Sequence, residues 1–106
     1  MKNSNIDWII KTDHEEVFTQ IESLSIHTID FVKKLKAVNN DSDFYYNQFS
    51  PIFKDYSNLV WDYKNYLKHN ISISTDKKEK TKLQRYDLML DSNFKLTCNT
   101  IVLALN

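Results

Sequence analysis

Residues 17–38 read VFTQIESLSIHTIDFVKKLKAV, and this stretch decides the fold. Its mostly apolar seam recurs at alternating spacings of four and three residues, which is typical of one face of an amphipathic helix. The seam consists of Val17, Ile21, Leu24, Thr28, Phe31, Leu35 and Val38. Carrying the same register backwards adds Ile10 and His14 to this face. We therefore predict a first long helix that begins near residue 12 and ends at the polar loop 39–42.

A second helix is indicated by an aromatic stripe at helical spacing. Its main members are Phe49, Phe53, Tyr56, Val60, Tyr63 and Leu67. Ser50 followed by Pro51 is typical of an N-cap and a first helical position, so residues 43–49 form either a separate turn or a kinked extension. We expect this helix to end near Asn70, and residues 70–76 to form a loop with a brief extended stretch.

A third helix is expected to begin at Asp76, because Glu79 then stands in the position of a capping box. Its stripe consists of Leu83, Tyr86, Leu90, Phe94, Thr97, Cys98, Ile101 and Leu105. The segment 94–105 is rich in β-branched residues, so a terminal strand or hairpin is the alternative there. We keep the helix because its period continues through the segment without a break.

Together these patterns predict an all-α protein that forms a single helical domain over residues 1–106. Short loops make successive helices antiparallel, which gives an up-down-up bundle of three long amphipathic helices. The second of these is expected to be kinked or split near Pro51. We also expect dimerisation to complete the bundle, because the helices carry more apolar surface than a three-helix monomer can bury.

The composition excludes whole classes of function, above all because the chain contains no glycine. P-loops, dinucleotide-binding fingerprints and the nucleophile elbow all depend on glycine at fixed positions. The chain has 14 basic and 14 acidic residues, and Arg85 is the one arginine, which disfavours a nucleic-acid partner. A single cysteine, no signal-like segment and no apolar run of membrane length lead us to expect a cytoplasmic protein without a membrane partner.

Several large apolar side chains fall away from the three stripes. They are Trp8, Ile26, Ile29, Leu88, Leu96 and Leu103. At about 100° per residue, Ile26 and Ile29 share a helix face with Glu22 and Lys33. We predict that this surplus forms a second interface, although scattered apolar surface residues are also ordinary. The predicted homodimer interface consists of Ile26, Ile29, Leu96 and Leu103.

Trp61 is the strongest single candidate for contact with a partner protein, because it lies among polar residues of the second helix. Tyr45, Tyr46 and Tyr66 flank the aromatic stripe and could form the rim of such a site. The alternative is that a kink at Pro51 rotates Trp61 into the core. The full set of predicted partner-binding residues is Trp8, Ile26, Ile29, Tyr45, Tyr46, Trp61 and Tyr66.

A basic run opens the third helix, where positive charge opposes the helix dipole. It consists of Lys77, Lys78, Lys80, Lys82 and Arg85. These residues could contact a phosphate or an acidic partner. The alternatives are pairing with the acidic first half of helix one, or a solvated face with no specific role.

No catalytic or metal-binding set is recognisable in the sequence. His14, His27 and His69 are far apart, and none follows a carboxylate at the spacing of a helical metal site. Cys98 falls on an apolar stripe, which predicts a core thiol. We therefore expect no enzyme, no cofactor and no bound metal. The leading hypothesis is a small protein-binding module, such as an inhibitor, an immunity or antitoxin-like protein, or a regulator from a phage or mobile element. The alternatives are a dimeric nucleic-acid-binding regulator that uses the basic run, and a structural oligomerisation module.

Overall fold

The computed structural model describes residues 5–38 and 42–105, with the side chains of 38 and 42–46 left out. It contains a short helix α1 (Ile6–Lys11) and three long helices, α2 (His14–Val38), α3 (Ser42–Ile73) and α4 (Lys77–Leu105). The described part of the chain contains no strand, so the all-α prediction is confirmed.

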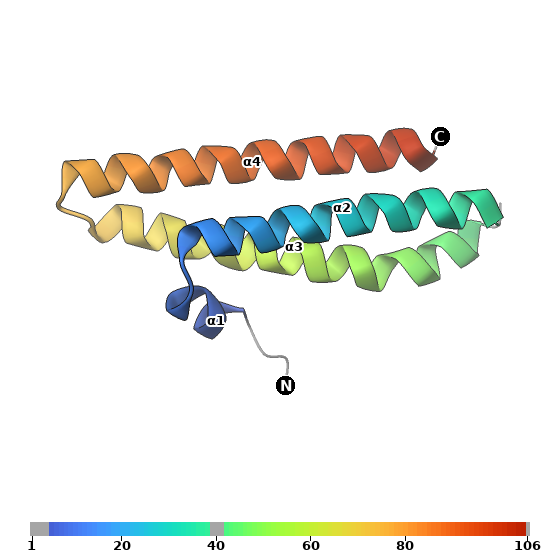
Figure 1. Ribbon diagram of the computed structural model, residues 1–106, viewed down its shortest axis with the longest axis horizontal. Coiled ribbons are helices and arrows are strands. Elements are labelled where there is room, and N and C mark those ends of the chain that lie inside the picture. The colour runs from blue at the N-terminus through green and yellow to red at the C-terminus, as the bar shows by residue number, and fades with distance from the viewer. Residues whose placement is uncertain (1–4, 39–41, 106) are drawn as a thin grey trace.

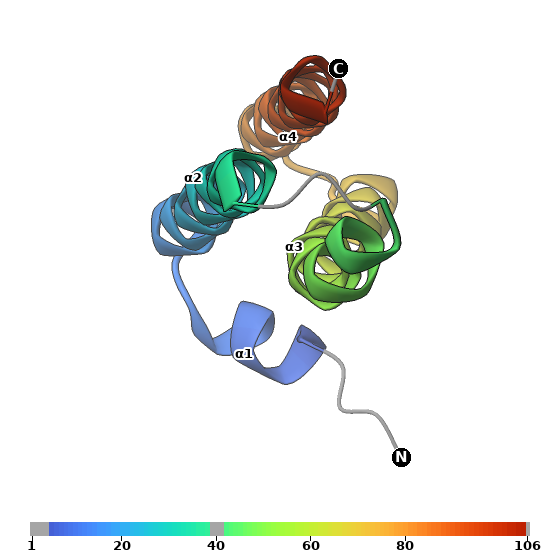
Figure 2. The ribbon, with the colours of Figure 1, turned by 90° about the vertical axis from the view of Figure 1, so that its right-hand side faces the viewer.

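The three long helices pack against one another in every pairing. Figure 1 shows α2 and α4 running in the same direction and α3 running in the opposite one. Seen along the bundle in Figure 2, α1 lies beside α2 and α3, on the side away from α4. The fold is therefore the expected up-down-up arrangement with one further short helix.

The separate helix α1 corrects the prediction for the start of the chain. The backward extension of the first seam placed Ile10 on the buried face, but Ile10 is exposed and its neighbour Ile9 is buried. Thr12 has extended backbone angles, φ −116° and ψ 147°, and interrupts the helix between α1 and α2. A break of this kind resets the helical register, so the period of α2 carries no information about α1.

Helix α3 is longer than predicted at both ends. It runs through Pro51 without a break, so the predicted split is wrong, whereas Figure 1 shows the expected bend in its first half. An internal proline lacks the N–H for one helical hydrogen bond and crowds the preceding turn, which bends a helix. At the other end, the predicted loop 70–76 is wrong in its first half because half-buried Ile71 packs against the core and extends the helix.

Helix α4 begins and continues as predicted. The backbone N–H of Lys78 donates to Oδ1 of Asp76 at 3.0 Å, which caps the helix at the expected residue. The helix then extends to Leu105, so the alternative of a terminal strand is wrong. Thr97 and Ile101 are buried within the doubtful segment, and their burial against α2 and α3 outweighs the weak helix propensity of β-branched residues.

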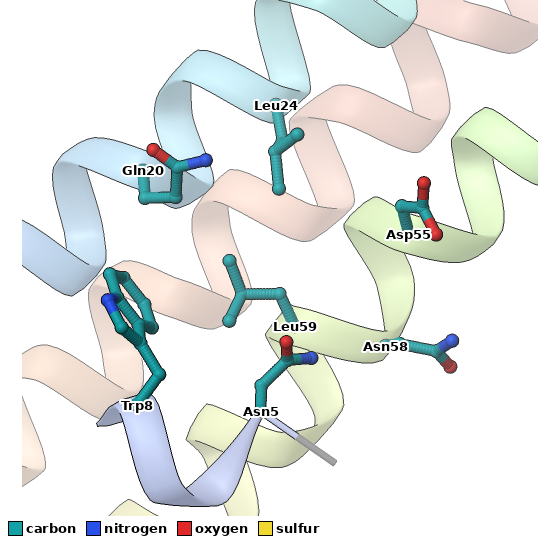
Figure 3. A pocket seen from close by; sticks show the side chains of 7 residues that line it. All are labelled: Asn5, Trp8, Gln20, Leu24, Asp55, Asn58 and Leu59. Atoms are coloured by element: carbon teal, nitrogen blue, oxygen red, sulfur yellow. The ribbon is translucent and has the colours of Figure 1, made fainter. Parts of the chain in front are cut away.

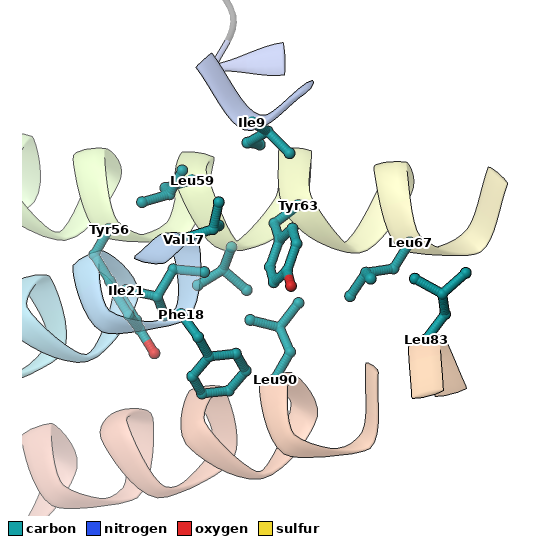
Figure 4. Packing of buried hydrophobic residues seen from close by; sticks show 11 residues of the cluster. Ile9, Val17, Phe18, Ile21, Tyr56, Leu59, Tyr63, Leu67, Leu83 and Leu90 are labelled. Atoms are coloured by element: carbon teal, nitrogen blue, oxygen red, sulfur yellow. The ribbon is translucent and has the colours of Figure 1, made fainter. Parts of the chain in front are cut away.

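The hydrophobic core lies between the three long helices, with Ile9 of α1 added at one side (Figure 4). It consists of Ile9, Val17, Phe18, Ile21, Tyr56, Leu59, Val60, Tyr63, Leu67, Leu83 and Leu90. A buried polar network adjoins it. The Tyr56 hydroxyl donates to Asn93 Oδ1 at 2.5 Å and lies 3.1 Å from Thr97 Oγ1, and Ser25 Oγ lies 2.6 Å from Thr97 Oγ1. These bonds link all three long helices at one level.

Candidate functional site

Helix α1 closes one end of a groove between α2 and α3. It is fixed there by two contacts that reach far along the chain. The backbone N–H and the side-chain amide of Asn5 both donate to Asp62 Oδ2, at 3.0 and 3.2 Å. Ile9 is buried above α3 close to Tyr63 (Figure 4). The short helix is therefore held by one apolar anchor and one charge-assisted polar contact.

The groove beside α1 has a volume of about 490 Å³, within the size range of ligand pockets. We call it the α1 groove, and it is lined by Asn5, Trp8, Gln20, Leu24, Asp55, Asn58 and Leu59. Figure 3 shows Leu24 and Leu59 in the middle, with the Trp8 indole on one side and the Asp55 carboxylate on the other. The arrangement offers an apolar floor, an aromatic wall and a ring of hydrogen-bonding groups.

Asp55 is the charged group of this groove and has no cationic partner within the described chain. Both ion pairs among the described residues involve Lys64, which contacts Asp87 at 3.0 Å and Asp91 at 2.6 Å. Asp62, a second carboxylate of α3 near α1, accepts hydrogen bonds from Asn5. The α1 groove therefore presents one carboxylate that is available to a cation from outside, and across the groove an aromatic ring that also attracts cations.

The predicted partner-binding residues do not gather in one place. Trp61 is 64% exposed, so the alternative in which it joins the core is wrong, and it is absent from the α1 groove lining. Tyr66 lies instead beside His14, with 6.1 Å between the ring centres. Trp8 lines the α1 groove. The side chains of Tyr45 and Tyr46 lie outside the described residues.

Ile26 and Ile29 belong to a different side of the molecule. Ile26 is 61% exposed, whereas Ile29 is half-buried, so the two are not equally outward as predicted. On α4, Leu96 and Leu103 are 68% and 75% exposed. Ser25, the neighbour of Ile26, contacts Thr97, the neighbour of Leu96, which brings this predicted set to the same part of the α2–α4 pair.

His14 forms an aromatic cluster that the sequence did not reveal. Its Nδ1 lies 3.0 Å from the hydroxyl of Tyr63, and its ring stacks on Tyr86 with 5.1 Å between the ring centres. Burial, reinforced by the nearby charge of Lys82, lowers the pKa of His14 below its usual range. Burial also raises the pKa of the Tyr63 hydroxyl. A histidine hydrogen-bonded to a buried tyrosine and stacked on Tyr86 thus joins α2, α3 and α4.

The basic run at the start of α4 is exposed throughout. Four of its five predicted members line a shallow concavity of about 580 Å³ together with Thr81, namely Lys77, Lys78, Lys82 and Arg85. Among the described residues, no ion pair joins this run to the acidic residues of α2. Of the alternatives considered for the run, pairing with the first half of α2 is therefore wrong.

Chemistry-bearing side chains elsewhere form no recognisable centre. Among the described residues, no group of three or more His, Cys, Asp or Glu side chains is arranged to hold a metal ion. Cys98 is half-buried, and burial raises the pKa of its thiol, which opposes formation of the nucleophilic thiolate. In the described part of the chain, no helix combines the length and apolar character needed to span a bilayer.

The α1 groove was missed at the sequence level because three distant segments build it. Leu24 and Leu59 appeared only as members of core stripes, and Asp55 as one of many surface charges. The available signal was Trp8, a large aromatic residue just before a helix break. No family model, curated protein or solved structure that was compared with the chain matches it.

Proposed function

We propose that this protein is a small, non-catalytic protein-binding module that acts by occluding a partner protein. An inhibitor, an immunity or antitoxin-like protein, and a regulator from a phage or mobile element all act in this way. The observation that carries the proposal is the α1 groove, where the Trp8 indole, a leucine floor and the Asp55 carboxylate surround one opening. Aromatic anchors next to adaptable polar groups are the usual composition of a protein-binding hot spot.

The chemistry of the α1 groove favours a lysine or arginine side chain of the partner. The alkyl stem of such a side chain can pack on Leu24 and Leu59 while its charged end reaches Asp55. The Trp8 ring adds a cation–π contact worth about 0.5–1 kcal/mol at an exposed site. Asn58 and Gln20 can hydrogen-bond the backbone of the same segment. The occupant that we propose is therefore a short basic and aliphatic segment of another protein.

The sharpest test places a photo-cross-linking amino acid at Asn58, inside the groove, in cells of the source organism. We expect one discrete protein adduct, which should be lost when Asp55→Lys or Trp8→Ala is added. The matched control places the same probe at Gln84, an exposed residue of α4. An adduct that forms equally from both positions, or that survives Asp55→Lys, would contradict the proposed site.

Trp61 supplies a second, independent test of the same function. It is the more exposed of the two tryptophans, and it does not line the α1 groove. If it extends the binding surface, Trp61→Ala should weaken the captured complex at least about tenfold, as expected for a hot-spot residue. An unchanged affinity would remove Trp61 from the site and leave the α1 groove as the whole of it.

We also propose that the chain forms a homodimer through α2 and α4, on a side of the bundle that α1 does not cover. The support is the gathering of exposed apolar side chains along α4 and the adjacent part of α2, which is the composition of an interaction surface. Sedimentation velocity over a hundredfold range of concentration tests this directly. A protein that dimerises and captures no partner would instead be a structural oligomerisation module.

Binding to nucleic acid is a second candidate function, favoured by one observation. Lys77, Lys78, Lys82 and Arg85 share one concavity and are unpaired within the described chain. Such a surface would contact phosphates, and its affinity for duplex DNA should fall steeply with salt, whereas partner capture in the α1 groove should fall less. Fluorescence anisotropy between 50 and 200 mM salt, roughly the range over which phosphate contacts lose most affinity, distinguishes the two.

A further inference from the structure

The side of the bundle formed by α2 and α4 is one that α1 does not cover (Figure 2), and we call it the open side. A groove of about 420 Å³ runs along it, lined by Phe18, Glu22, Arg85, Leu88, Met89, Ser92, Asn93 and Leu96. Leu88, Met89 and Leu96 are exposed in this lining. The α1 groove has a helix of the same chain beside it, but the open side has none.

Four residues on the outer face of α2, three of them exposed and Ile29 half-buried, form a pattern that is the same when read in either direction. Glu22, Ile26, Ile29 and Lys33 follow one another at spacings of four, three and four. Reversing the helix about the midpoint between residues 27 and 28 exchanges Ile26 with Ile29 and Glu22 with Lys33. Among the described residues, neither Glu22 nor Lys33 forms an ion pair within its own chain. Two antiparallel copies of α2 would therefore match apolar against apolar and acid against base at both ends.

Helix α4 carries a second pattern with the same property. Leu96 and Leu103, two strongly exposed apolar residues of α4, exchange places about the midpoint between residues 99 and 100. The hydrogen bond between Ser25 and Thr97 sets the level of the two parallel helices, at an offset of 72 residues. That offset carries the midpoint of the α2 pattern, between 27 and 28, onto the midpoint of the α4 pattern, between 99 and 100. A single two-fold axis at this level would therefore relate both α2 and α4 to their copies in a second chain.

We infer that the open side binds a second copy of this chain in an antiparallel, two-fold symmetric dimer, with Glu22 facing Lys33 of the partner subunit. In the same arrangement Leu96 lies opposite Leu103 of the partner subunit, next to the open-side groove. An interface of this kind is isologous, since one patch supplies both halves. The inference rests on the proposed homodimer and adds its direction, its register and its charged contacts.

The size of the open side agrees with this occupant. Helix α2 has 25 residues, which gives a length of about 37 Å at 1.5 Å per residue. Two adjacent helices, each roughly 10 Å wide, then present on the order of 700 Å². Stable interfaces bury about 600–1,000 Å² on each partner, so full burial of this face would give an interface of standard size.

Charge reversal tests the proposed direction. Glu22→Lys places lysine against Lys33 of the partner subunit, and Lys33→Glu places glutamate against Glu22 of the partner subunit. We expect each single variant to raise the dimer dissociation constant at least about tenfold in sedimentation velocity at low salt, because like charges then face each other at two places. The double variant Glu22→Lys/Lys33→Glu should return the dissociation constant to within about threefold of the original, since both pairs are restored.

The register is tested by disulfide formation between copies, in a Cys98→Ala background. A mixture of the Glu22→Cys and Lys33→Cys proteins should form the mixed disulfide, and neither protein alone should cross-link efficiently. A parallel dimer would instead cross-link the Glu22→Cys protein to itself, which would overturn the proposed geometry. Circular dichroism of each variant confirms that its helices are intact.

The outcomes separate the two levels of the proposal. A wild-type monomer at every concentration would overturn the homodimer and, with it, this arrangement. A dimer that the double variant fails to restore would leave the homodimer standing and overturn the antiparallel pairing. Partner capture through Asn58 is measured independently of both, so the failure of either leaves the test of the α1 groove unaffected.

Discussion

The two sides of α2 face different neighbours, although they belong to one helix. Towards α3, the groove is closed at one end by α1, which brings Ile9 into the core and a polar pin from Asn5 to Asp62. Towards α4, the surface carries exposed Ile26 and Leu96, and no further helix of the described chain covers it. A helix of six residues is thus enough to complete one side of a three-helix bundle.

The comparison shows how a small chain divides its apolar surface. A three-helix bundle has three outer grooves, and covering each with its own short helix would lengthen the chain considerably. Helix α1 covers one of the three, and the open side is among those it leaves uncovered, where exposed apolar residues carry a risk of aggregation unless another molecule covers them. The open side is therefore the natural place for self-association, and the α1 groove, with its polar rim, suits a selective partner.

The largest effect is expected from the residue that attaches α1. Ile9→Ala should lower the free energy of unfolding by about 2–4 kcal/mol, because it removes a fully buried side chain and leaves a cavity. The adjacent control Ile10→Ala should change it by less than about 0.5 kcal/mol, because Ile10 is exposed. Urea unfolding followed by circular dichroism measures both. Equal effects of the two substitutions would mean that α1 does not pack as described.

A smaller effect is expected at the polar network that sets the level of α4 against α2. Tyr56→Phe removes the hydroxyl that donates to Asn93 Oδ1 and lies 3.1 Å from Thr97 Oγ1, leaving these groups with one partner fewer. We expect a loss of about 1–2 kcal/mol in the free energy of unfolding. Tyr66→Phe is the control, since Tyr66 is only half-buried. An unchanged free energy of unfolding for Tyr56→Phe would show that the network does not fix the register on which the symmetry of the open side depends.

The polar pin of α1 should contribute less again. Asp62→Ala removes both hydrogen bonds from Asn5 and should cost about 1 kcal/mol, seen as faster hydrogen exchange of the α1 amides. Asp55→Ala removes a carboxylate without an ion pair and should leave both stability and exchange nearly unchanged. In partner capture the order of the two effects should be reversed, because Asp55→Ala is expected to weaken binding more than Asp62→Ala. Equal exchange rates in α1 for both variants would argue against the pin.

Much of this fold could be predicted from the sequence because long periodic stripes determine long helices. Val17, Ile21, Tyr63 and Leu90 are buried as their spacing indicates, and Asp76 caps α4 as expected. The errors arose where the period is interrupted or a local signal competes with packing. Thr12 breaks the first helix without any glycine or proline to mark the position. Pro51 lies inside α3 without ending it, so Ser50 and Pro51 did not mark the start of the helix.

The candidate sites divide along the same line. The exposure of Ile26, Leu96 and Leu103 follows from the geometry of the single helix to which each belongs. These residues were correctly placed outside the core. Trp61 is also exposed, because the bend at Pro51 does not rotate it inwards. The α1 groove could not be predicted, since only tertiary packing brings Asp55 and Trp8 to the two sides of one groove.

The smallest effect concerns pH and the contact between all three long helices at His14. Burial and the charge of Lys82 lower the pKa of His14 in the folded chain, while Glu79 and Asp13 act in the opposite direction. The remaining neighbours are the rings of three tyrosines, to one of which the imidazole is hydrogen-bonded. The unfolded chain therefore binds a proton at His14 more readily than the folded chain does.

Stability should accordingly be full above the ordinary histidine pKa of 6.5 and should decrease as the pH falls below it towards the lowered value in the folded chain. His14→Gln offers hydrogen-bonding groups to Tyr63 but cannot titrate, so its free energy of unfolding should fall less between pH 7 and pH 5. Urea unfolding at several pH values, at one fixed protein concentration, measures the difference between the two proteins. Parallel pH profiles would mean that His14 is equally easy to protonate in the folded and unfolded chains.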